Sequence, residues 1–182
     1  MGEEGVSGRF GFLLLLISAC LLFYGAPSRS VWSDRIRDML VKTTLYQFKL
    51  YPAGDLDREL TMFLKEAEEV LCRALRRNGA TCYRDYAREG YSQEEIERLL
   101  DEEIRNWRML GVGGMNIARL IRISKQFKDL EAKPLSDKIL LFDELIHAEH
   151  YGGGLFNVDI PRIKRQADRE VQRILRERGV KA

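Results

Sequence analysis

The sequence predicts an all-α fold: a compact bundle of five to six helices, preceded by an N-terminal apolar leader or anchor segment. Two observations predict it. Apolar residues recur every three to four positions along most of the chain, which is the period of an amphipathic helix. No stretch alternates apolar and polar residues as a half-buried strand would. Of the 182 residues, 45% are hydrophobic and 32% are charged, a composition typical of a globular protein.

Residues 1–30 are predicted to be the leader, and residues 31–182 a single α-helical domain. The leader contains fifteen consecutive apolar or small residues at positions 10–24, fewer than the ~20 that span a bilayer as a straight helix. This length favours the core of an export signal or a membrane anchor. The alternative is a start assigned too early, with the working chain beginning near Val31 or Met39. The first interpretation predicts an exported or membrane-associated protein, and the second a cytoplasmic one.

The first two helices of the domain are separated by a proline. One helix is expected from Ser33, its N-cap, to about Leu50, because Pro52 disfavours helical backbone in the residue before it. The next is expected over residues 55–78, where the helical period is clearest. Its predicted inward face consists of Leu56, Leu60, Phe63, Leu64, Ala67, Leu71, Ala74 and Leu75.

The middle of the chain carries two helix start signals. Residues 80–90 are predicted to be a short helix or an ordered loop. Ser92 and Glu95 then form a capping box, in which each side chain bonds to the other's backbone N–H. That helix is expected to carry Leu110 on its inward face and to end there, at a glycine-rich segment. Asn116 is predicted to cap the following helix.

The last two helices surround the glycines 152–154. Ser136 is the predicted N-cap of the first, which is apolar on nearly every side and is therefore expected to be buried and central. Pro161 fits the first turn of the last helix, where a missing N–H costs nothing. The inward face of that helix is predicted to be Ile160, Ile163, Ala167, Val171, Ile174 and Leu175.

The last helix is also the most basic part of the chain. Residues 160–182 contain eight basic and three acidic side chains. Five arginines recur at spacings of three or four, which places them along one side of a helix, opposite the apolar stripe. We call this side the arginine face: Arg162, Arg165, Arg169, Arg173 and Arg176. It is the predicted contact surface of a binding or interaction module. The alternative is a nucleic-acid-binding protein that uses the same arginines.

An acidic segment offers a partner for such a face. Residues 92–104 contain six acidic side chains and one basic one. The two helices are expected to face each other either within the fold or across a homodimer, and an unrelated protein partner remains open. Residues 10–24 are the expected membrane contact, and the basic stripe of the last helix also suits an anionic membrane surface.

The central helix carries the only candidate metal ligands. Asp143, His147 and His150 lie at positions i, i+4 and i+7 of one helix, so their side chains share one side. Carboxylate and imidazole together suit a divalent transition metal. The favoured interpretation is structural, with Asp143 accepting a hydrogen bond from His147, and no cofactor is expected. A metal-dependent enzyme is the alternative.

The three cysteines do not form a zinc-binding pattern. Cys20 lies in the leader, so Cys72 and Cys82 are left to pair with each other if the protein is exported. In a cytosolic protein both are expected to be inert thiols, and the sequence favours this outcome without deciding it. No serine or cysteine has the setting of a nucleophile, so an interaction module is favoured over an enzyme.

Overall fold

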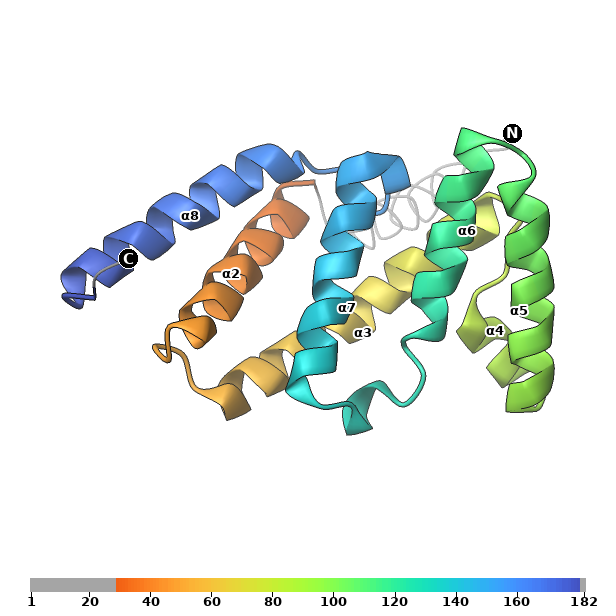
Figure 1. Cartoon of the computed structure of the whole chain (residues 1–182), viewed down its shortest axis with the longest axis horizontal. Coiled ribbons are helices and arrows are strands. Elements are labelled where there is room, and N and C mark those ends of the chain that lie inside the picture. The colour runs from red at the N-terminus through yellow and green to blue at the C-terminus, as the bar shows by residue number, and fades with distance from the viewer. Residues whose placement is uncertain (1–28, 181–182) are drawn as a thin grey trace, which may run out of the picture.

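The computed structural model describes residues 29–180, and this part of the chain consists of helices joined by turns and short loops, with no strand. The all-α prediction is therefore confirmed (Figure 1). The predicted leader segment at residues 10–24 lies outside the described residues. Within residues 29–180, no helix is both long enough and apolar enough to cross a membrane. The α-helices are α2 (Arg29–Gln47), α3 (Ala53–Arg77), α4 (Tyr83–Arg88), α5 (Gln93–Arg108), α6 (Val112–Lys125), α7 (Leu135–Ala148) and α8 (Ile160–Glu177).

The structure has seven α-helices in the described range, one more than the bundle of five to six predicted from the sequence. The addition is α4, a single short helix that apolar periodicity alone left undecided. Two further short turns complete the fold. They are a 3-10 helix, η1 (Leu130–Ala132), and a π-helical turn, η2 (Glu149–Gly153), that continues α7.

Three helices begin earlier than their predicted caps. Ser33 lies inside α2, and Asn116 lies inside α6. The cap of α6 is Gly111, whose φ of +79° lets the chain reverse direction in the left-handed region that suits glycine. At α7, Pro134 takes the cap position instead of Ser136. By contrast, the capping box of α5 is confirmed: Glu95 N–H donates to Ser92 Oγ at 3.3 Å, and Ser92 N–H donates to Glu95 at 2.9 Å.

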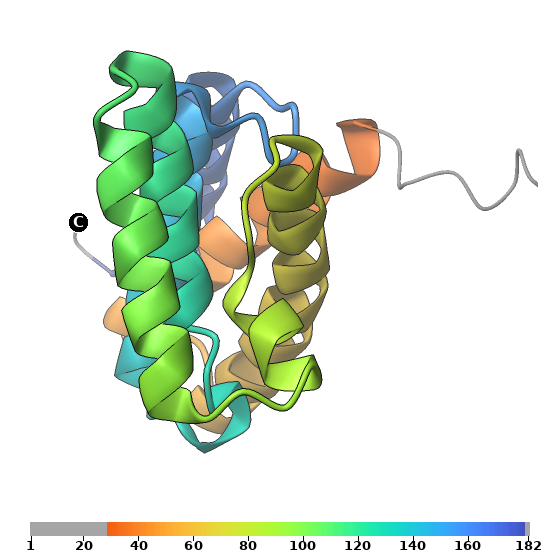
Figure 2. The same cartoon turned by 90° about the vertical axis from the view of Figure 1, so that its right-hand side faces the viewer.

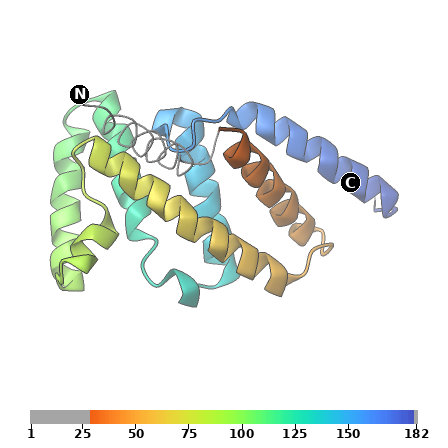
Figure 3. The ribbon, with the colours of Figure 1, turned by 180° about the vertical axis from the view of Figure 1, so that it is seen from behind.

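Helix α3 forms the back of the molecule and links its two ends (Figure 3). Its predicted inward face is entirely buried. It contacts α2 towards one end, and α6 and α7 along its length. The apolar sequence of α7 predicted a helix that is buried on all sides, and this prediction is wrong. Leu141, Phe142 and Leu145 are buried against the core, but Leu140 is exposed on the opposite side. The helix therefore covers the core with one face only.

The two ends of the molecule are built differently. At one end, α5 and α6 pack side by side as an antiparallel pair, with α4 beside them (Figure 2). At the other end, α8 lies along α2 (Figure 1). The α2–α8 pair has an apolar cluster of its own, distinct from the main core, formed by Val41, Leu45, Ala167, Val171 and Leu175.

A disulfide between Cys72 and Cys82 ties the end of α3 to the start of α4. The two Cα atoms lie 5.2 Å apart, within the usual range for a disulfide, and both residues are buried. The sequence favoured free thiols without excluding this pairing, and the structure contains the disulfide. An ion pair reinforces the junction: Arg76 Nε lies 2.9 Å from Asp85 Oδ2, and this bond lowers the pKa of the Asp85 carboxyl.

Replacing both Cys72 and Cys82 by alanine is expected to lower the free energy of unfolding by about 3 kcal/mol. This is the entropy that a bond closing a loop of about ten residues removes from the unfolded chain. Urea unfolding of the oxidised protein and of the double variant measures the difference. A reducing agent should destabilise the original protein and leave the double variant unchanged. Equal stability of the oxidised and reduced proteins would contradict the bond.

Candidate functional site

All five residues of the arginine face are exposed in the structure. Helix α8 buries the opposite stripe, which consists of Ile160, Ile163, Ala167, Val171 and Leu175. Its main contact is with α2, and it also contacts η2. Because α8 lies at one end of the molecule (Figure 1), the face directed away from α2 is open along the helix, which is about 27 Å long.

The positive charge of this face is largely left without partners inside the molecule. Arg173 pairs with Glu177 of the same helix at 2.8 Å. Arg176 Nε donates to the Gln172 carbonyl at 3.2 Å. The other three arginines make no ion pair with any residue in the range 29–180. The face therefore presents guanidinium groups that an external anionic surface can contact.

The acidic segment of α5 does not meet the arginine face within the fold. Helices α5 and α8 lie at opposite ends of the molecule (Figure 1). Some of the acidic side chains have local partners instead. Lys125 of α6 pairs with Glu97 and with Asp101, and Glu103 accepts a hydrogen bond from Thr81 N–H at 2.9 Å. An internal α5–α8 pairing is therefore wrong, and only a pairing between two copies stays open.

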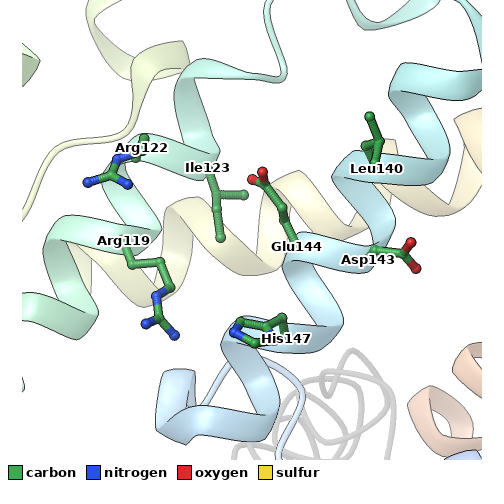
Figure 4. A pocket seen from close by; sticks show the side chains of 7 residues that line it. All are labelled: Arg119, Arg122, Ile123, Leu140, Asp143, Glu144 and His147. Atoms are coloured by element: carbon green, nitrogen blue, oxygen red, sulfur yellow. The ribbon is translucent and has the colours of Figure 1, made fainter.

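The three candidate metal ligands are not gathered into one site. Among residues 29–180, no group of three or more His, Cys, Asp or Glu side chains is placed to hold a metal ion. The carboxyl group of Asp143 points away from His147 (Figure 4). Instead, the ring of Tyr151 contacts both imidazoles, with centroids 4.5 Å from His147 and 4.7 Å from His150. The predicted hydrogen bond between Asp143 and His147 is also absent from the described part of the chain.

A pocket of about 410 Å³ separates α6 from the exposed side of α7 (Figure 4). Arg119 and His147 point into the same space, whereas Glu144 accepts a hydrogen bond from Gln126. Partial burial raises the pKa of Asp143, and the nearby Lys164 opposes this shift. Because basic and acidic groups alternate here, the pocket has no consistent charge preference. Its lining residues are Arg119, Arg122, Ile123, Leu140, Asp143, Glu144 and His147.

Glu149 holds the segment between α7 and α8 in place, a role that no sequence pattern predicted. The carboxylate of Glu149 is buried and accepts hydrogen bonds from the N–H groups of Leu155, Phe156 and Val158 at 2.6, 3.1 and 3.0 Å. These bonds fix the chain that leads into α8 and so position the arginine face. The sequence signal was weak, because a glutamate at the end of a helix is usually solvent-exposed.

No family model, curated protein sequence or solved structure matches this chain.

Proposed function

We propose that this protein is a helical binding module that contacts an acidic protein surface through the arginine face of α8. The proposal rests on two properties of these arginines: their side chains are exposed, and most of them have no acidic partner within residues 29–180. Five arginines lie along one open helix face, and Arg162, Arg165 and Arg169 have no ion pair within residues 29–180. Exposed charge complementarity of this kind sets the orientation and the rate of association more than the affinity.

A protein partner fits this face better than single-stranded nucleic acid does. The outer side of α8 offers no aromatic ring on which a base could stack. Its arginines lie in a straight row along a helix, so a partner helix or a flat acidic patch can run parallel to it. The acidic helix α5 of a second copy has this character, which keeps a homodimer among the partners to be tested.

The test compares two variants with the same change in charge. The first carries Arg165→Glu, Arg169→Glu and Arg173→Glu on the arginine face. The control carries three substitutions of exposed arginines on α3 and α5: Arg73→Glu, Arg77→Glu and Arg98→Glu. The full chain is passed over immobilised poly-glutamate and over immobilised duplex DNA at increasing salt, and its association state is measured by sedimentation.

We expect the first variant to lose about tenfold in retention on poly-glutamate, and the control to lose much less, because only the first removes a continuous face. Equal losses in both variants would mean that net charge alone drives retention, and the proposal would fail. Stronger retention on DNA, abolished by the same three substitutions, would favour the nucleic-acid alternative. Self-association that only the first variant loses would identify the partner as a second copy.

A further inference from the structure

The turn between α5 and α6 exposes an unusual number of large apolar side chains. Four of them occur within seven consecutive residues, and their exposed fractions lie between 59% and 84%. Single exposed apolar side chains are common on protein surfaces, but several gathered in one short segment indicate a contact surface. We call it the apolar turn: Met109, Leu110, Val112 and Met115.

The apolar turn is held in place by the structure around it. Leu110 N–H donates to the Trp107 carbonyl at 3.0 Å, and Met115 N–H donates to the Gly111 carbonyl at 2.9 Å. Gly114 lies so close to α5 that there is no room for a larger residue. The four apolar side chains are therefore presented by an ordered turn at the end of two packed helices.

Basic side chains flank the apolar turn on both sides in the sequence. Arg105 and Arg108 precede it and Arg119 and Arg122 follow it, whereas the acidic residues 101–103 lie further back on α5. Arg105 and Arg108, which come directly before the turn, are exposed and have no ion pair in the described part of the chain. Apolar side chains at a tip with arginines beside them match the two layers of an anionic bilayer surface, which are acyl chains beneath negative headgroups.

The position of the apolar turn in the molecule also favours contact with a lipid bilayer. The turn between α5 and α6 and the first residues of α2 both lie towards the top of the molecule in Figure 1, although Figure 2 shows them on opposite sides of it. The apolar run at residues 10–24 ends four residues before α2 begins. Tyr151 is exposed in η2, whose Gly152 lines a pocket of about 460 Å³ together with Leu110. Tyrosine is a common residue at the headgroup level of membranes.

We propose that the apolar turn inserts into the surface of an anionic lipid bilayer, with Arg105 and Arg108 contacting the headgroups. The insertion is interfacial and does not require a membrane-spanning segment in this region. It places the top of the molecule in Figure 1, from which α2 starts, towards the membrane. The proposal does not depend on the arginine face of α8, which lies on a different helix and at the other end of the molecule.

The test measures the depth of one side chain in the membrane. An environment-sensitive fluorescent amino acid replaces Met115 in one full-length protein and Met62 in another. Both methionines are 59% exposed, but Met62 lies on α3, away from the turn. Each protein is combined with vesicles of phosphatidylcholine and phosphatidylserine that carry brominated acyl chains, which quench fluorophores at their own depth. We expect quenching and a blue shift for the probe at position 115 only.

Two further variants separate the apolar and the basic contributions. With Leu110→Ser and Val112→Ser together, quenching of the probe at position 115 should fall to the level at position 62. With Arg105→Gln and Arg108→Gln, it should fall to the level that the original protein shows in pure phosphatidylcholine. The triple substitution on α8 described above should leave it unchanged. Circular dichroism confirms that each variant is folded.

Equal and weak quenching at both positions would overturn the proposal, whether or not the chain associates with the vesicles. Shielding of position 115 that increases with protein concentration in the absence of lipid would also overturn it, because a second copy would then cover the turn. Failure of the poly-glutamate experiment with quenching preserved would refute the proposed function and leave this inference standing.

Discussion

Replacing Gly114 by alanine is expected to lower the free energy of unfolding by about 3 kcal/mol, at the upper end of the cost of overfilling a packed site. An added Cβ would overlap the backbone carbonyl oxygen of Trp107 and would lie 2.9 Å from the Cβ of Leu110. A backbone atom cannot rotate away as a flexible side chain can. The substitution must therefore push α5 and α6 apart.

The neighbouring glycine provides the matched control. Gly113 is also in the first turn of α6, but a Cβ there would meet nothing within 4 Å. Gly113→Ala should therefore raise the free energy of unfolding by about 0.5 kcal/mol, because alanine restricts the unfolded chain and favours helix. Urea unfolding of both variants measures the contrast. Equal effects of the two substitutions would mean that α5 and α6 are not in close contact at Gly114.

Replacing Glu149 by alanine is expected to cost about 3 kcal/mol of unfolding free energy, because three N–H groups lose their acceptor. Leu155 and Phe156 are buried, so water cannot easily replace the carboxylate. Glu149→Gln keeps one acceptor oxygen without the charge and should cost less. As a control, Glu102→Ala changes an exposed glutamate of α5 and should alter stability by less than about 0.5 kcal/mol.

Hydrogen exchange locates the effect of the Glu149 substitution. The amides of Leu155, Phe156 and Val158 should exchange much faster in Glu149→Ala, whereas amides in the middle of α3 should change only as far as global stability does. Unchanged protection of these three amides would show that the carboxylate does not hold the segment.

The sequence was a good guide to which faces are buried. The inward face predicted for residues 55–78 is buried in α3 in full, and the stripe predicted for the last helix is buried apart from the half-exposed Ile174. These predictions succeeded because a period of 3.6 residues relates sequence directly to the side of a helix. The exposure of the five arginines follows from the same period, since they occupy the opposite side of α8.

Contacts between distant residues were not predictable in this way. The bond between Cys72 and Cys82 depends on where the chain returns after α3, and the role of Glu149 depends on the path of residues 155–158. Helix starts at a proline or glycine were missed because serine and asparagine nearby are common caps. The prediction that Leu110 faces inward is wrong, because this side chain is 69% exposed at the end of its helix and periodicity does not tell whether a terminal residue is covered.

The sequence by itself therefore determined the all-α class, the buried stripes and the arginine face, because each depends on local periodicity and charge. Only the tertiary structure decided the disulfide, the separation of α5 from α8 and the exposure of the apolar turn. It also showed that Asp143, His147 and His150 are not gathered as a metal site. The physical reason is that helix period fixes the direction of a side chain from its own axis, whereas the packing of helices fixes what that side chain meets.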